Sequence, residues 1–336
     1  MKNDRSVLKR QFAGLIVFAL LLFAAMFFAA GTLARDRALA DAKRELMTRA
    51  QFLAHALDRT LQQRMIQAFT FAALPSLRGF AASDETTRDA RAAIARVELA
   101  AIVNADPNIR AATIVDKNGI VIMTTDDAMY ANWRARGFVS AALRGHLHAS
   151  TPAREANAVV QFYSAPILNN AGDIAGALVL RVNAQEMWNA LTAPYHIIVV
   201  DEIGVRLMDR SYAQLFVALA PVPADLAAPP LAEKRYGADI TEIRATNLTD
   251  LANAAQRGGA AQLVYRDASG RAIHAATQRI TTNPWTVIVS ESEDDILLPA
   301  RQALYAQIGI AIASALITLA LVYAAQSVFA TAGRKR

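Results

Sequence analysis

The sequence predicts an α+β fold in which a long helix precedes two antiparallel-sheet modules in tandem, with a membrane-spanning helix on either side. Two apolar stretches without charge, one near each end of the 336-residue chain, predict the membrane helices. Short β-rich runs separated by Asp- and Asn-containing turns predict the sheets. One turn pattern occurs twice, which predicts that the sheet module is duplicated.

The first apolar stretch covers residues 12–33, and a helix of about 20 apolar residues is long enough to cross a bilayer. Basic residues hold short flanks in the cytoplasm, so residues 1–11 are predicted to be a cytoplasmic tail. The basic residues of this tail are Lys2, Arg5, Lys9 and Arg10. The alternative is a cleaved signal peptide, for which Ala29, Ala30 and Ala34 offer small residues, although the apolar core exceeds the usual length of about 7 to 15 residues.

The second apolar stretch, 302–333, contains the predicted second span at 304–326. The tail at 327–336 ends in Arg334, Lys335 and Arg336, so it is also predicted to be cytoplasmic. With both termini inside, the central region is expected to lie outside a cell membrane that the chain crosses twice. Each predicted tail has only about ten residues, which is too few for a folded domain.

The formal net charge of +6 comes from the two short tails, which leaves the central region close to neutral. The high pI therefore reflects membrane topology and does not predict nucleic-acid binding. The chain has no cysteine, which excludes a disulfide framework, a thiol nucleophile and a thiolate metal site.

Residues 34–105 are expected to form two helices. Apolar residues at spacings of three and four predict an amphipathic helix from residue 34 to about 80: Leu46, Ala50, Leu53, Leu57, Leu61, Met65 and Phe69. Pro75 and Gly79 mark its expected end, and a second helix is expected at 87–105. The apolar face of the long helix either packs on its own domain or forms a homodimer interface, and both alternatives remain open.

Residues 106–193 and 194–303 are expected to form the two sheet modules. The first should contain strands at 112–115, 120–124, 159–164 and 175–182 and a helix at 133–143. The second should contain strands at 261–266, 272–279 and 285–290. The repeated turn pattern is Asp116-x-x-Gly119 in the first module and Asp201-x-x-Gly204 in the second. In this pattern the aspartate is expected to cap its own turn rather than to bind a ligand.

Five segments carry a family resemblance: the two Asp-x-x-Gly hairpins, residues 136–145 (RGFVSAALRG), residues 163–167 (YSAPI) and residues 283–287 (NPWTV). Residues 34–304 resemble a double Cache sensor, a pair of PAS-like modules found outside the membrane in bacterial chemoreceptors, histidine kinases and cyclases. The resemblance implies signal transduction by ligand binding, with the ligand in the membrane-distal module at 106–193 and a membrane-proximal module at 194–303.

By this resemblance Arg136 is the anchor for a ligand carboxylate, Phe138 is a pocket wall and Tyr163 lines the pocket from the facing strand. A planar guanidinium fits a carboxylate with two parallel hydrogen bonds. Further candidates lie between the second strand and the helix of the first module: Thr124, Thr125, Asp126 and Tyr130. The segment departs from the family pattern at Gly137 and Val139, and no Tyr-x-Asp follows it to receive an amino group. Small mono- or dicarboxylates are therefore expected ahead of amino acids.

No catalytic motif is present, so a non-enzymatic protein without a cofactor is expected. His146 and His148, with Glu155 nearby, are too weak a set to predict a metal site. Three readings of function remain: a sensor that passes its state through its membrane helices to a separate partner in the membrane, a membrane scaffold with an empty pocket, and a fragment of a sensor kinase or chemoreceptor.

Overall fold

The computed structural model describes residues 2–126, 132–155, 158–184 and 195–332. The chain divides into two compact units, one formed by Met1–Glu45 with Glu291–Arg336 and the other by Leu46–Ser290. Helix α1 (Lys2–Ala72) contributes to both units.

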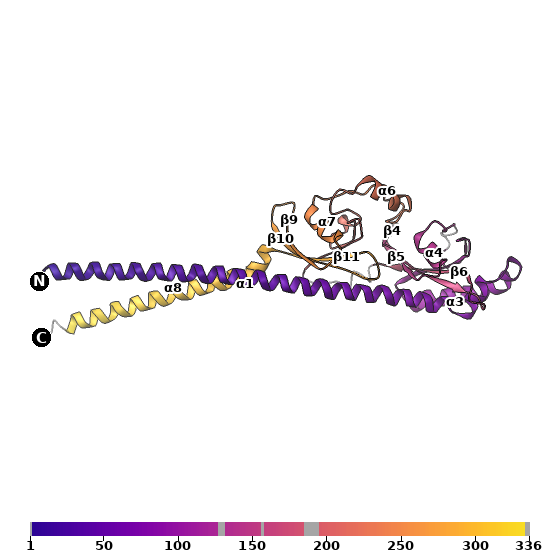
Figure 1. The fold of residues 1–336 in the computed structure, drawn as a ribbon. Coiled ribbons are helices and arrows are strands. Elements are labelled where there is room, and N and C mark those ends of the chain that lie inside the picture. The colour runs from indigo at the N-terminus through magenta and orange to yellow at the C-terminus, as the bar shows by residue number, and fades with distance from the viewer. Residues whose placement is uncertain (1, 127–131, 156–157, 185–194, 333–336) are drawn as a thin grey trace. The chain divides into compact units, whose positions relative to one another are not determined.

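The first unit consists of the N-terminal part of α1 and of α8 (Glu293–Ala332), drawn in indigo and yellow in Figure 1. An ion pair of 2.8 Å joins Arg35 of α1 to Glu293 of α8. In the described part of the chain, one helical segment, Glu293–Thr318, is long and apolar enough to cross a membrane. This segment overlaps the second predicted span. The first predicted span, at 12–33, is helical but does not add a second candidate among the described residues.

In the second unit, three helices form one layer: α1 from Leu46 onward, α2 (Pro75–Ala81) and α3 (Glu85–Ala105). The long helix ends at Ala72, close to the predicted Pro75, but Gly79 lies inside the new helix α2. Proline fits the first turn of a helix because it lacks an N–H, and it keeps the preceding residue extended. Leu74 has φ −59° and ψ 132°, so the chain turns there and α2 begins.

The first sheet has six strands in the order β2-β1-β6-β5-β3, with β4 also paired to β5. Its strands are β1 (Ile109–Asp116), β2 (Val121–Thr124), β3 (His148–Ala149), β4 (Ala153–Glu155), β5 (Ala158–Leu168) and β6 (Ile174–Asn183). The helix predicted at 133–143 is shorter, because α4 covers only Gly137–Ala142. The Trp133 N–H donates to the Gly119 carbonyl oxygen (2.8 Å), which ties this segment to the β1–β2 turn instead.

The second sheet has five strands in the order β8-β7-β11-β10-β9. Its strands are β7 (His196–Val200), β8 (Arg206–Asp209), β9 (Ala261–Arg266), β10 (Ala272–Arg279) and β11 (Thr286–Ser292). Between β8 and β9 lie η1 (Tyr212–Gln214), α6 (Ala224–Ala232) and α7 (Thr249–Gln256). In both sheets the first strand of the module lies between the second and the last, so the predicted duplication is confirmed in the strand order.

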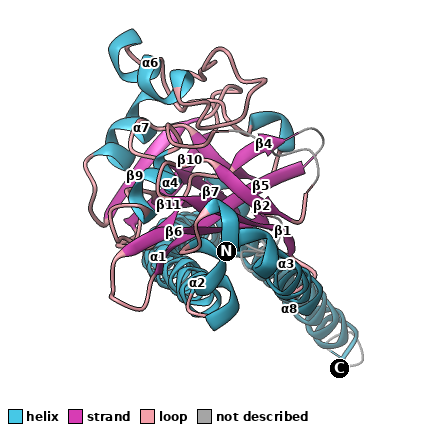
Figure 2. Cartoon of the chain, turned by 90° about the vertical axis from the view of Figure 1, so that its right-hand side faces the viewer, coloured by secondary structure: helices cyan, strands magenta, loops and turns pink. Residues whose placement is uncertain are grey.

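Both sheets of this unit pack one face against the same helical layer. Figure 2 shows α1, α2 and α3 on one side of the strands and α6 and α7 on the other. The buried apolar face of α1, including Leu46, Leu53 and Leu57, shares one core with residues of both sheets, so packing on its own domain is confirmed for this part of the helix. Helix α4 covers the opposite face of the first sheet, with Phe138 and Val139 packed against Phe162 and Val179.

Four turns of the second unit have the same hydrogen-bonding pattern. In each turn, the side-chain Oδ1 of the first residue accepts two backbone N–H groups, from the residues two and four positions later. The four first residues are Asp116, Asn169, Asp201 and Asp267. A glycine at the fourth position has a positive φ between 79° and 91° in all four turns. The predicted capping role of Asp116 and Asp201 is confirmed.

Candidate ligand-binding site

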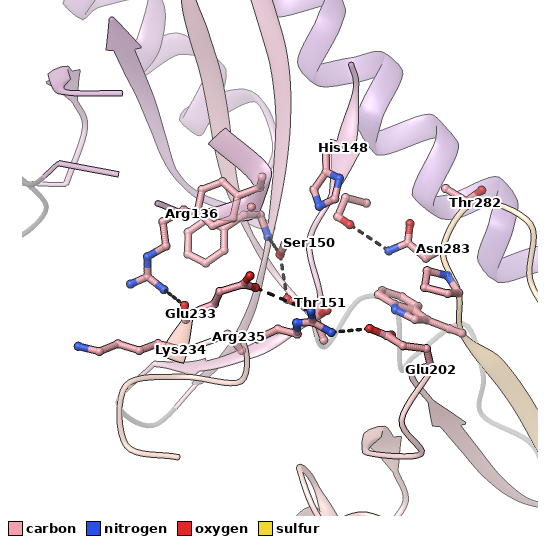
Figure 3. Close-up of a pocket in the computed structure, with 17 residues that line it drawn as sticks. Arg136, His148, Ser150, Thr151, Glu202, Glu233, Lys234, Arg235, Thr282 and Asn283 are labelled. Atoms are coloured by element: carbon pink, nitrogen blue, oxygen red, sulfur yellow. Dashed lines mark hydrogen bonds and ion pairs between the residues drawn. The ribbon is translucent and has the colours of Figure 1, made fainter. Parts of the chain in front are cut away.

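A cavity of about 310 Å³ lies in the second unit, where residues of both sheet modules meet (Figure 3). The first module contributes the start of α4, strand β3, residues 150, 151 and 153, and Phe162 of β5. The second module contributes Glu202 and the loops at 233–235 and 282–285. An adjoining cavity of about 370 Å³ shares four lining residues with the first: Arg136, Ala153, Phe162 and Lys234.

Arg136 lies at the junction of these two cavities because it is the extended N-cap residue of α4, with φ −77° and ψ 126°. Its Nη1 donates a hydrogen bond to the main-chain carbonyl oxygen of Glu233 (3.2 Å), which connects the first module to a loop of the second. Among the residues that the structure describes, no carboxylate forms an ion pair with Arg136. Its guanidinium therefore retains donors for an anion.

The other charges around the cavity compensate one another. Arg235 forms an ion pair with Glu202 (2.5 Å) and a longer one with Glu233 (3.8 Å), as the dashed lines in Figure 3 show. Burial alone would lower the pKa of Arg235, but the hydrogen bond and charge of Glu202 outweigh burial and raise this pKa. Lys234 adds a further cation from a left-handed backbone conformation with φ 53°, which is uncommon for a residue other than glycine.

The remaining walls are mainly apolar and aromatic. The rings of Phe138 and Phe162 stack in parallel, with centroids 4.6 Å apart and an angle of 6° between their planes. Pro284 and Trp285 line the cavity from the second module. Burial and the charge of Arg144 lower the pKa of His148, which favours a neutral imidazole at the cavity wall.

Of the predicted site residues, Arg136 and Phe138 line the cavity and Tyr163 does not. Tyr163 is only 3% exposed, and it packs in the core shared with α1, where its hydroxyl donates to Gln161 Oε1 (2.7 Å). Successive side chains of a strand point to opposite faces, so the neighbouring Phe162 reaches the cavity instead. At this position of β5 the cavity is therefore lined by Phe162, and the expected residue Tyr163 faces the core instead.

The second-rank candidates lie elsewhere in the first module. The hydroxyl of Thr124 pairs with that of Thr113 (2.9 Å), and the hydroxyl of Thr125 accepts the Ala112 N–H (3.0 Å). Asp126 forms an ion pair of 2.5 Å with Arg181 of β6. None of these three predicted residues lines the cavity, and Tyr130 lies outside the described residues.

Little in the sequence indicates that the second module contributes to the cavity. Residues 202, 234 and 235 are far from Arg136 along the chain; Glu202 lies inside the Asp201-x-x-Gly204 turn, and residues 234 and 235 belong to no motif. The segment 283–287 is the exception, because it was one of the marks of family resemblance, and its residues Asn283, Pro284 and Trp285 line the cavity.

The cavity loop at 282–285 is fixed to both α1 and the first sheet. The buried carboxylate of Asp58 on α1 accepts the N–H groups of Thr281 (2.8 Å) and Thr282 (2.8 Å). The amide of Asn283 donates to the carbonyl oxygen of Ala149 on β3 (2.9 Å). Burial alone would raise the pKa of Asp58, but these hydrogen bonds from Thr281 and Thr282 lower it. The loop therefore connects the cavity directly to the long helix.

The described residues contain no group of three or more His, Asp or Glu side chains arranged to hold a metal ion. His148 lines the cavity beside Ala149 on β3, and it belongs to no such group.

The sequence matches no protein-family model and no curated protein. Its fold matches solved structures. The sensor domain of the V. cholerae histidine kinase DctB has a TM-score of 0.62 and 13% identity, over 75% of this chain and 98% of that chain. The ligand-binding domain of the Campylobacter jejuni chemoreceptor Tlp3, solved with L-valine, has a TM-score of 0.54 and 13% identity, over 79% and 98%. The double Cache fold expected from the sequence is confirmed.

Proposed function

We propose that this chain is a membrane-anchored extracytoplasmic sensor that binds a small carboxylate at the cavity lined by Arg136. The observation that carries the proposal is a guanidinium without a carboxylate partner among the described residues, placed at a cavity with aromatic walls. Arginine matches a carboxylate geometrically, and a few polar groups in a mainly apolar cavity are typical of small-molecule sites. The similar Tlp3 domain binds L-valine, which supports a small-molecule ligand.

We further propose that ligand binding is communicated through the long helix. Arg136 contacts the loop at 233–235, and the cavity loop at 282–285 follows the residues bonded to Asp58 of α1. If these contacts have two alternative conformations, a ligand shifts the equilibrium between them only when it binds one conformation more tightly than the other. In this proposal the spans at 12–33 and 304–326 anchor the chain with both termini in the cytoplasm, and a separate membrane protein receives the signal.

A homodimer through α1 is part of the same proposal. Phe52 and Ile66 are spaced by four turns of α1, and their side chains are 63% and 58% exposed. Exposed large apolar side chains on one helix are a feature of interaction surfaces. Dimerisation would bring together two copies of the helix that carries the Asp58 contact.

The test is a thermal-shift screen of the full-length chain in detergent against small carboxylates. A carboxylate at about 100 times its Kd should stabilise the chain by roughly 2.7 kcal/mol, and Arg136→Ala should remove this effect. Arg134→Ala is the matched control, because Arg134 is exposed, lies two positions away and lines neither cavity. Equal stabilisation of the Arg136→Ala variant by the same carboxylate would show that the site is elsewhere.

A further inference from the structure

We infer that the ligand is a carboxylate that has a flat apolar body, such as an aromatic ring, and no ammonium group. This inference rests on the proposed function, because it concerns what the Arg136 cavity selects. It follows from three features of the lining: the state of its polar side chains, the nature of its walls and its size.

The polar side chains of the lining are already engaged with one another. Glu202 and Glu233, the two lining carboxylates, both pair with Arg235. If Glu202 or Glu233 instead bound a ligand ammonium group, the half-buried guanidinium of Arg235 would lose one of its two carboxylate partners. This loss is unfavourable in a partly desolvated site. An α-amino group therefore finds no carboxylate available among the described lining residues.

Two of the neutral polar side chains, Ser150 and Asn283, are similarly occupied. The Ser150 hydroxyl donates to the Thr151 carbonyl oxygen (2.8 Å) and accepts the Phe162 N–H (2.9 Å). The Asn283 amide donates to the Ala149 carbonyl oxygen (2.9 Å). Arg136 and Lys234 are thus the cations of the described lining for which no carboxylate partner is found, and Arg136, with its planar set of N–H donors at the junction of the two cavities, specifies a carboxylate.

The walls select the rest of the molecule. Phe138 and Phe162 form a parallel stack, and Pro284, Trp285 and Ala153 add further apolar surface. Flat apolar groups pack well against aromatic rings, with a gain of about 0.5–1.5 kcal/mol beyond simple burial. A second carboxylate placed against these rings would be buried without a partner, which is costly. The adjoining cavity offers Arg154, but this side chain already pairs with Asp239 (3.8 Å) and lies over the ring of Phe216.

The cavity volume favours a small ligand of this class. Small-molecule sites usually have volumes of about 300–1,000 Å³, and 310 Å³ lies at the lower end of that range. A single ring bearing a short acid side chain is therefore a better match than an extended ligand.

The experiment measures binding of five probes to the full-length chain in detergent by isothermal titration calorimetry: benzoate, phenylacetate, L-phenylalanine, succinate and benzamide. Benzoate or phenylacetate should bind at least about tenfold more tightly than L-phenylalanine and succinate, a difference of about 1.4 kcal/mol, and benzamide should not bind measurably. Phe162→Leu should weaken binding of the aromatic acid by about tenfold, while Arg134→Ala should leave it unchanged.

The outcomes separate the two proposals. If succinate or L-phenylalanine binds more tightly than both aromatic acids, and this binding is lost in Arg136→Ala, the ligand class is wrong and the proposed site stands. If every bound carboxylate keeps its affinity in Arg136→Ala, both proposals fail. If Phe162→Leu does not fold, as judged from its circular dichroism, the ranking of the five probes on the unsubstituted chain decides the inference alone.

Discussion

The surroundings of Asp201 raise the pKa of its carboxyl group. Its side chain is 2% exposed, its Oδ1 accepts two turn N–H groups, and the Tyr236 hydroxyl donates to its Oδ2 (2.5 Å). Burial raises the pKa of Asp201 from 3.8 to about 7, since the hydrogen bonds to the carboxylate offset burial only in part. The folded chain therefore holds a proton on this carboxyl group at mildly acidic pH.

This raised pKa predicts a loss of stability as the pH rises. Between about pH 4 and pH 7 the unfolded chain releases the Asp201 proton while the folded chain keeps it, so the free energy of unfolding should fall by up to roughly 4 kcal/mol across this interval. Urea unfolding of the full-length chain in detergent at pH 4, 5.5 and 8 measures the fall, and Asp201→Asn should flatten it.

Asp116→Asn is the matched control, because Asp116 begins the equivalent turn in the first module and is partly exposed. The pH dependence should persist in this variant. An unchanged pH dependence in Asp201→Asn would assign the effect to other groups.

The residues of the site were predictable only where local sequence determines their position. Arg136 and Phe138 were predicted to line a pocket, and they line the cavity, because one short segment both forms the start of α4 and resembles a family motif. Phe162 was missed because neighbouring residues of a buried strand are equally apolar, so that the sequence does not show which face each one occupies. Arg235 was missed because its position depends on how the loop after α6 packs, which no local pattern encodes.

At the scale of elements, the decisive contact is between helix α1 and the loop that precedes β11. This loop has no secondary structure, and the backbone N–H groups of Thr281 and Thr282 are satisfied by the Asp58 carboxylate of the helix. Because Asp58 is 7% exposed, removing it leaves these N–H groups without a partner in a region that water reaches poorly. The contact therefore sets the position of the loop relative to α1.

Asp58→Ala should lower the free energy of unfolding by about 2–4 kcal/mol, because two buried N–H groups lose their acceptor. The lowered pKa of Asp58 adds a pH dependence. The ionised Asp58 carboxylate stabilises the folded chain above pH 3.8, and this stabilisation is lost as the pH falls below that value. Urea denaturation at pH 7 measures the loss. Asp89→Ala, which removes an exposed carboxylate of α3, should change stability by less than about 0.5 kcal/mol, and a similar loss in both variants would contradict the assigned role.

Elements with strong local signals were predicted well. The bounds of β9 and β10 agree with the expectation to the residue, because Asp267-x-x-Gly270 separates two clear β-rich runs. The short strands β3 and β4 were not predicted. They are two and three residues long and owe their conformation to pairing with β5, which is a long-range interaction.

At the scale of the whole molecule, the topology proposed from the basic tails is open to a direct test. The chain has no cysteine, so a single introduced cysteine reports its own location. In intact bacterial cells a membrane-impermeant maleimide should label Asn170→Cys, which lies in an exposed turn of the second unit. It should label Lys335→Cys, in the C-terminal tail, only after permeabilisation. Labelling of Lys335→Cys in intact cells would place that terminus outside.

In each of the four equivalent turns, the two terminal atoms of the first Asp or Asn side chain form different hydrogen bonds. Oδ1 always closes the turn, whereas the other atom has a different partner in each copy: the Asn118 amide, the Asp173 carboxylate, the Tyr236 hydroxyl or the Arg271 guanidinium. An evolving chain is therefore free to change the second partner without losing the hairpin. At Asp201 the second partner is the hydroxyl of the buried Tyr236, so this turn holds a carboxyl group whose pKa is raised by burial.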